Sequence, residues 1–362
     1  MITFVLLAVL AKVAAGALVE RVLHGKQVLS TTSDVTLPLP GNVTIADTSK
    51  AFVRVSVTAP AGAHTSATMV AATLTTDNVT LVRASFHLGA VAAVTVRYSI
   101  VVFAADSGVL VLRGVANAGA SNSHVIDTSG DPNYRPYDAT SSFVVLSPLV
   151  AGTVYGDNDF WMPHLSGSQA IMVECDRGSS LADAVIHWQL VSLGAANAKV
   201  QHVQADKPMV GTGVNVTITT PERFVAARTW VIAHIRTRAE RAKFNQVDVD
   251  VVDISADDGT SDTVQIRRGA PVTSSAQRIA VAVQVIEFLR DVSVGRHRFS
   301  LRAGSQGDFW LFSFRTGVAS GASNALLTSG VGYFGTKTDV DEQNSFISSA
   351  LVGCAYELVP SQ

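Results

Sequence analysis

The chain has 362 residues, of which 48% are hydrophobic and 15% are charged, and its formal net charge is -2. This length suits two to four domains. The composition excludes general disorder, which accompanies low hydrophobicity and high net charge, and the near-neutral charge argues against nucleic acid as a partner. Only seven Lys and seven Glu are present, too few of these helix-favouring residues for a mostly helical protein. We therefore expect a mainly β fold.

Residues 1–19 form the one strongly helical stretch, because they are apolar apart from Thr3 and Lys12 and rich in Ala and Leu. They predict a helix of about five turns. A signal peptide would have a basic start, which is missing here, and a membrane span would carry Lys12 at its middle. We favour a helix buried against other copies of the chain or against a partner, and we do not expect a membrane.

A strand-like segment with an aromatic residue followed by branched apolar residues occurs four times. Its aromatic positions are 80 to 91 residues apart and are Phe52, Phe143, Trp230 and Trp310. A second segment follows each copy after 44 to 53 residues and alternates strictly between two faces. In the first copy one face carries Val94, Val96, Tyr98 and Ile100. This period of two predicts half-buried β-strands.

The spacing divides the chain into a helix followed by four tandem small antiparallel β-sandwich domains. Each unit holds several short strands separated by Gly, Asp, Asn, Ser and Thr turns, which is typical of a sandwich or small barrel. The predicted boundaries are 1–19 for the helix and 20–104, 105–194, 195–289 and 290–362 for the four repeats. The connections between repeats are short, so we expect an ordered rod or a compact cluster rather than a flexible string.

The search for chemistry gives little. Cys175 and Cys354 lie in strand-like runs and are far apart, so we expect buried thiols rather than a disulfide framework or zinc site. The nine histidines lack metal-ligand spacing, and no nucleophile elbow, phosphate loop or dinucleotide fingerprint occurs. The acidic stretch from Asp248 to Asp262 could bind calcium, but Asp257-Asp258-Gly259 is better interpreted as a hairpin turn. We predict no enzyme, no cofactor and no metal.

The most distinctive local segment is Asp157 to His164, which combines carboxylates with aromatic residues in a loop-like setting. Asp157, Asp159, Trp161 and His164 are the candidate ligand-binding residues, because aromatic faces stack on sugars and Asp accepts hydroxyl protons. The alternative, which we favour, is that Phe160 and Trp161 anchor the loop on the core of the second repeat.

Short motifs in the repeats carry a family resemblance. They are Leu112-Arg113-Gly114 at the opening of a unit, Ser142-Phe143-Val144 in its aromatic strand, and His187-Trp188-Gln189-Leu190 or Val283-Gln284-Val285-Ile286-Glu287-Phe288 at its close. The unit resembles the tandem β-sandwich repeats in virion proteins of tailed bacteriophages and is loosely similar to the H-type lectin sandwich. The fourth copy departs from it, with Gly353-Cys354 where an aromatic strand belongs.

The resemblance implies a non-enzymatic structural component of a virion, either a tail, fibre or capsid-decorating protein. Such a protein acts as an oligomer, and its partners are other copies of itself, other virion proteins and a glycan of the host surface. Low charge agrees with this, because faces that pack against neighbours avoid the cost of charge desolvation. The alternative is a secreted or cell-surface carbohydrate-binding adhesin with the Asp157 to His164 segment as its contact surface.

Overall fold

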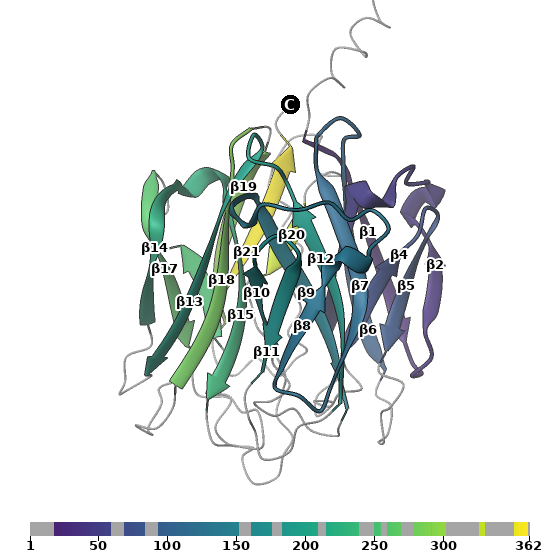
Figure 1. The fold of residues 1–362 in the computed structure, drawn as a ribbon, viewed down its shortest axis with the longest axis horizontal. Coiled ribbons are helices and arrows are strands. Elements are labelled where there is room, and N and C mark those ends of the chain that lie inside the picture. Colours follow the sequence, from purple (N-terminus) through teal and green to yellow (C-terminus); the bar gives the residue numbers. More distant parts are fainter. Residues whose placement is uncertain are drawn as a thin grey trace, which may run out of the picture.

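The protein is described here from a computed structural model (Figure 1). It describes residues 18–58, 69–83, 93–151, 161–175, 183–208, 215–238, 250–254, 259–268, 278–290, 292–301, 326–329 and 351–360, with only the backbone for some of them. The mainly β fold predicted from the sequence is confirmed, since the described elements are strands and short 3-10 turns.

Six strands form the first unit, and they make two three-stranded antiparallel sheets. The strands are β1 (Val19–Leu29), β2 (Val35–Pro38), β3 (Ala51–Thr58), β4 (Val70–Leu74), β5 (Asn78–Arg83) and β6 (Val94–Phe103), with 3-10 turns η1 (Pro40–Asn42) and η2 (Thr48–Lys50). One sheet has the order β1-β6-β3 and the other the order β2-β5-β4. The last strand of the unit therefore lies between its first and third strands.

The same arrangement occurs twice more. The second unit contains β7 (Leu110–Gly119), β8 (Ser123–Asp127), η4 (Thr128–Gly130), η5 (Ala139–Ser141), β9 (Ser142–Val150), β10 (Met162–Ser166), β11 (Ala170–Glu174) and β12 (Ala184–Ser192). The third contains β13 (Ala198–Pro208), β14 (Asn215–Val225), η7 (Ala226–Arg228), β15 (Thr229–Arg238), β16 (Asp250–Ile254), β17 (Thr260–Arg268) and β18 (Arg278–Phe288). Their sheets have the orders β7-β12-β9, β10-β11-β8, β13-β18-β15 and β14-β17-β16.

The final strands form a seventh sheet, with the order β19-β21-β20. They are β19 (Val292–Leu301), β20 (Leu326–Ser329) and β21 (Leu351–Pro360). Sequence spacing places the fourth aromatic strand at Trp310, which lies outside the described residues. In the described part, the strand that pairs with β21 opposite β19 is β20.

The predicted alternation in the closing strand is confirmed in β6. Val94, Val96 and Ile100 are fully buried, and Tyr98 is nearly so. They pack with residues of both sheets in a hydrophobic cluster that belongs to the first unit. A comparable cluster fills the second unit and includes Cys175, which is a buried free thiol as predicted.

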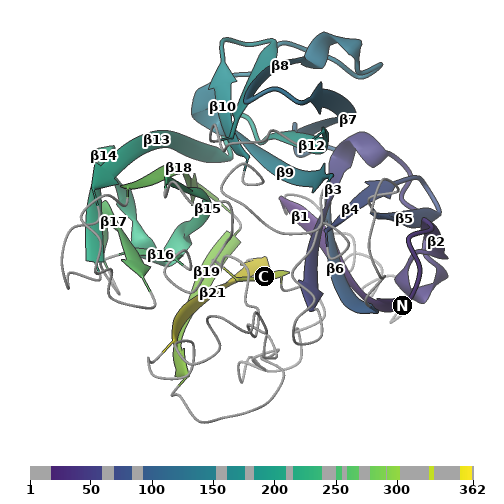
Figure 2. The same ribbon diagram turned by 90° about the horizontal axis from the view of Figure 1, so that it is seen from below.

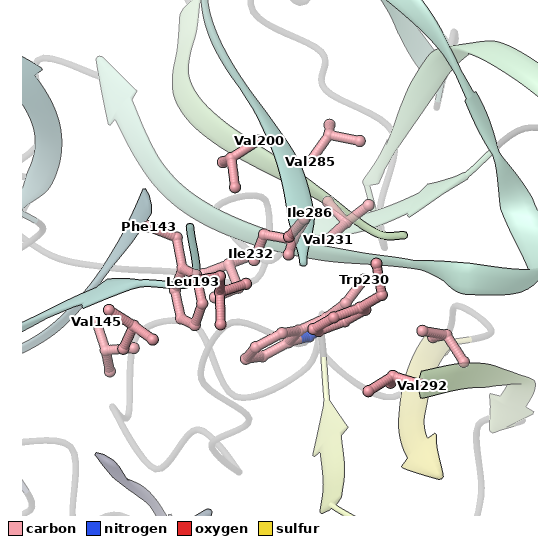
Figure 3. Close-up of a cluster of buried hydrophobic side chains, with 14 of the residues drawn as sticks. Phe143, Val145, Leu193, Val200, Trp230, Val231, Ile232, Val285, Ile286 and Val292 are labelled. Atoms are coloured by element: carbon pink, nitrogen blue, oxygen red, sulfur yellow. The ribbon is translucent and has the colours of Figure 1, made fainter. Parts of the chain in front are cut away.

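A further core joins the units at the centre of the molecule. Seen along the strands, the four groups of strands surround this common centre (Figure 2), so the units form a compact cluster rather than a rod. Phe52, Phe143 and Trp230 meet there: Trp230 lies 5.5 Å from Phe143 and 6.5 Å from Phe52, measured between ring centroids. Figure 3 shows part of this core, with side chains from the second and third units and Val292 of β19. The aromatic residues that mark the first three repeats thus belong to one shared core.

The N-terminal prediction requires one correction. The helix expected over residues 1–19 lies almost entirely outside the described residues, but its last residue, Val19, is the first residue of β1. Val19 pairs with Phe103 of β6 and is buried in the central core. Its β-branched side chain suits a strand, and tertiary contacts decide the boundary.

Candidate functional site

The structure describes two of the four members of the predicted ligand site. Asp157 and Asp159 lie outside the described residues. Trp161 is 4% exposed and belongs to the core of the second unit, so its indole packs inside the protein. His164 lies on β10 and is also buried, at 8% exposed. The sugar-binding role of this segment stays a prediction, and the two members that are described face protein rather than solvent.

His164 is held by its own sheet. Its Nε2 lies 3.4 Å from Oε2 of Glu174 on the neighbouring strand β11. The same strand β10 begins at Met162, which packs against Ala280 and Ala282 of β18 in the third unit. The strand after the predicted loop is therefore part of a contact between units.

The Tyr134 to Tyr137 segment is also rich in aromatic residues, and it forms an anchored loop. The hydroxyl of Tyr137 donates to the carbonyl of Ala170 at 2.7 Å. Tyr137 is 5% exposed, and burial raises its pKa to about 12. The segment covers the second core and offers no exposed aromatic face at Tyr137.

The best-built polar sites in the described residues are the contacts between units. We call the contact of the first and second units the first junction and that of the second and third units the second junction. At the first junction, Gln189 of β12 accepts from the Val53 N–H at 2.9 Å and donates to the Val53 carbonyl at 2.7 Å. At the second, Gln284 of β18 binds both backbone groups of Val144 in the same way, at 2.7 and 2.8 Å.

These two amide clamps occupy equivalent positions. Val53 follows Phe52 and Val144 follows Phe143 in the aromatic strands β3 and β9. Both glutamines are buried, so each clamp satisfies a backbone N–H and C=O that water cannot reach. The clamps therefore fix the register of one unit on the next.

A second contact accompanies each clamp. Arg113 of β7, which lies opposite Gln189 in the sheet, donates from Nη2 to the carbonyls of Thr48 and Ala51 around turn η2. His202 of β13, which lies opposite Gln284, contacts the equivalent carbonyls of Ala139 and Ser142 around turn η5 through Nε2, each at 3.0 Å. The two junctions thus have the same geometry but different side chains, and we call Arg113 and His202 the docking side chains.

An apolar contact completes both junctions on the side of the fourth strand. In the first unit Met69 precedes β4 and accepts a hydrogen bond from the Val150 N–H, with the Sδ at 3.4 Å, while Ala71 packs on Leu149. In the second unit Met162 makes the corresponding contact with the third unit. A flexible thioether suits such irregular gaps.

Burial lowers the pKa values of a guanidinium and two imidazoles that the junctions contain. The guanidinium of Arg54 lies over Trp230, 5.5 Å from the ring centroid, and burial lowers its pKa to about 10. Burial also lowers the pKa of His234 to about 4, and the charges of Arg54 and His164 add to this effect. The pKa of His202 is lowered by burial too, with a smaller opposing effect from its carbonyl partners.

Sequence reasoning found the strands that carry these contacts but missed their role. Gln189 and Gln284 stand at the same place in the two closing motifs, Trp188-Gln189-Leu190 and Val283-Gln284-Val285. A glutamine repeated at one position of an otherwise apolar strand is the signal that could have marked them.

No protein-family model matches the chain, and the search of curated proteins finds no match. Among the described residues, no group of three or more His, Cys, Asp or Glu side chains could hold a metal ion. In the same part of the chain, no helix has the length and apolar character needed to cross a membrane.

Proposed function

We propose that the chain is a non-enzymatic structural component of a bacteriophage virion, a tail, fibre or capsid-decorating protein that acts as an oligomer. In this proposal the chain consists of four tandem β-sandwich domains with boundaries near residues 104, 194 and 289. The observation that carries the proposal is the way in which the units are joined. Buried amide clamps and a shared aromatic core make the units one body, as a load-bearing or scaffolding part requires.

The outer sheets support assembly with further copies. These outer sheets are β2-β5-β4, β10-β11-β8 and β14-β17-β16. Strands β2, β8 and β14 each stand at one end of such a sheet and, among the described strands, pair on one side only. An open strand edge is a template for pairing with another chain. Pro38 lies in β2, and Pro221 lies in β14 within a register shift, whereas β8 has no proline and exposes Val125 at 60%. We therefore propose β8 as an edge that meets a second copy.

The assembly can be tested on the purified chain. Light scattering should show an oligomer, and Val125→Lys should shift it toward the monomer, because a charge on an edge opposes strand pairing. Leu289→Lys is the matched control, since Leu289 is also exposed but lies outside the strands. A wild-type chain that stays monomeric at high concentration would contradict the proposal.

The place on a particle needs a separate experiment. Immunogold labelling of negatively stained particles from the source culture should decorate the tail, the fibre or the capsid. Label confined to cell surfaces would instead favour the alternative, a carbohydrate-binding adhesin. A glycan array would then compare the wild type with Asp157→Ala and Asp159→Ala, because Trp161 is buried in the core of the second unit and its substitution would also disturb that core.

A further inference from the structure

We propose that the second junction is an acid-sensitive contact: protonation of His202 and His234 loosens the third unit on the second, while the first junction, held by Arg113, stays closed. The proposal does not depend on the virion function. It rests on the equivalence of Arg113 and His202, which contact the same two carbonyls of the preceding unit. The identity of the docking side chain, arginine or histidine, is thus the main difference between two otherwise matched contacts.

The second junction collects several cationic or protonatable groups from three units. His202 lies on β13, His234 on β15, His164 on β10 and Arg54 on β3. His164 acts electrostatically on both His202 and His234, and Arg54 acts on His234. Each proton added here therefore places a positive charge beside existing or potential positive charges.

Apart from Glu174, several acidic groups around this cluster have other partners. The charged groups described on or beside the elements that pack against β10, β13 and β15 are Glu174 on β11, Asp138 before η5, Lys199 and Asp206 on β13, Glu222 and Arg223 on β14, Arg228 in η7, Glu287 on β18 and Arg290 after it. Asp138 caps the Thr140 N–H, Glu222 pairs with Lys199, and Glu287 pairs with Arg228. Strands β16 and β19 also pack on β15. They carry five charged or titratable residues of which the structure describes only the backbone: Asp250, Asp253, Arg296, His297 and Arg298.

Among the described residues, Glu174 is the carboxylate that contacts an imidazole of this cluster, that of His164.

The lowered pKa values make the stability of the second junction depend on pH. Below the ordinary pKa of histidine, near 6.5, the unfolded chain binds more protons than the folded chain if the folded pKa is lowered. Stability supplied by neutral His202 and His234 is then present above about pH 6.5 and is lost as the pH falls. For His234 the loss continues down to its folded pKa of about 4.

The first junction differs in this respect. Arg113 keeps its charge at every pH of this window. One described imidazole with a shifted pKa lies near it, His187 on β12, and there the lowering caused by burial is opposed by the charge of Asp34. The first junction should therefore respond less to acid than the second.

Two amide protons report the two junctions separately. The Val53 N–H is bound by Gln189 at the first junction, and the Val144 N–H is bound by Gln284 at the second. Hydrogen exchange by NMR on the full chain, corrected for the intrinsic pH dependence, gives a protection factor for each. Between pH 7 and pH 5 we expect protection of Val144 to fall by about tenfold or more and that of Val53 by less than about threefold. Equal changes at both amides, or none at Val144, would overturn the proposal.

Exchanging the docking side chains tests the cause. His202→Arg should reduce the acid response of Val144, and Arg113→His should create one at Val53. His234→Gln, which keeps a hydrogen-bond donor for Val144 but cannot titrate in this range, is a second route to an acid-resistant junction. If His202→Arg fails to fold at pH 7.5, His234→Gln decides alone. An acid response at Val144 that persists in every folded variant would overturn the assignment to these histidines.

Discussion

The first and second junctions share one contact, the glutamine clamp, and differ in the other, the docking side chain. Both use a buried glutamine that binds a valine of the preceding aromatic strand through two hydrogen bonds. The accompanying docking side chain is Arg113 in one and His202 in the other. The comparison teaches that the same backbone-directed clamp accompanies two different docking side chains, an arginine and a histidine, each of which contacts two carbonyls.

The largest expected effect comes from a residue that both junctions share. Trp230 is 1% exposed and contacts both Phe143 and Phe52. Trp230→Ala should lower the free energy of unfolding by about 3–5 kcal/mol, because it removes a large buried side chain and leaves a cavity. Urea unfolding measures the loss, and amide exchange should show reduced protection of Val53 and Val144 together.

Leu81→Ala is the control for Trp230→Ala. Leu81 is fully buried in the separate core of the first unit, so its loss should destabilise that unit while protection of Val144 changes less. If the two variants affected the two amides in the same proportion, the central core would not be the link between the junctions.

The clamps themselves should give the next largest effect. Gln189→Leu leaves the N–H and C=O of Val53 buried without partners, and Gln284→Leu does the same to Val144. Each should cost about 2–4 kcal/mol, since an unsatisfied buried polar group costs about 1–3 kcal/mol. Urea unfolding of the two variants beside Gln204→Leu, an exposed position on β13, would check this. A large difference between the two losses would mean that the clamps are not equivalent.

The strands of the fold follow from the sequence more fully than the contacts between the units. Alternation in β6 identifies Val94, Val96 and Ile100 as buried because a strand has two faces and one of them meets its own core. Periodicity carries no information about a face that meets another unit. Gln189 reaches Val53, 136 positions earlier in the chain, so no local pattern around it contains its partner.

The predicted site shows the same limit. The composition of the Asp157 to His164 segment suits a sugar-binding loop, but its local pattern cannot tell a surface indole from an anchoring one. Trp161 immediately precedes β10, and that short strand places Met162 against the third unit and Trp161 in the second core. Tertiary packing therefore decides that the side chains of Trp161 and His164 are buried.

Inside the first and second units, a glycine faces a large aromatic ring at equivalent positions. Gly25 lies opposite Tyr98, and a Cβ added to it would be 2.0 Å from Cζ of that ring. Gly114 lies under Trp188 in the second unit in the same way, with a closest approach of 2.7 Å. The third unit has a valine on each strand at this place, Val203 opposite Val283. Glycine with a large ring and valine with valine fill a comparable volume.

Gly25→Ala should therefore destabilise the first unit by about 1–3 kcal/mol, because the added methyl group displaces the Tyr98 ring. The double variant Gly25→Val with Tyr98→Val, copied from the third unit, should recover much of that loss. Thermal unfolding followed by circular dichroism measures both. A double variant less stable than Gly25→Ala would show that the units do not exchange this pair freely.

The smallest expected effect concerns an exposed charge on the strand that carries His202. Lys199 of β13 pairs with Glu222 of β14, and their side chains are 33% and 64% exposed. Lys199→Ala should change the free energy of unfolding by less than about 1 kcal/mol, since an exposed ion pair gains little over solvent, and the change should shrink in high salt. Urea unfolding at two salt concentrations, at pH 7 and at pH 5, measures this change in the free energy of unfolding.

His202 should behave in the opposite way. Its contribution to stability should depend on pH but change little with salt, because its carbonyl partners are neutral and partly buried. If Lys199→Ala abolished the acid response of the second junction, surface charge rather than the buried imidazoles would explain the difference between the two junctions.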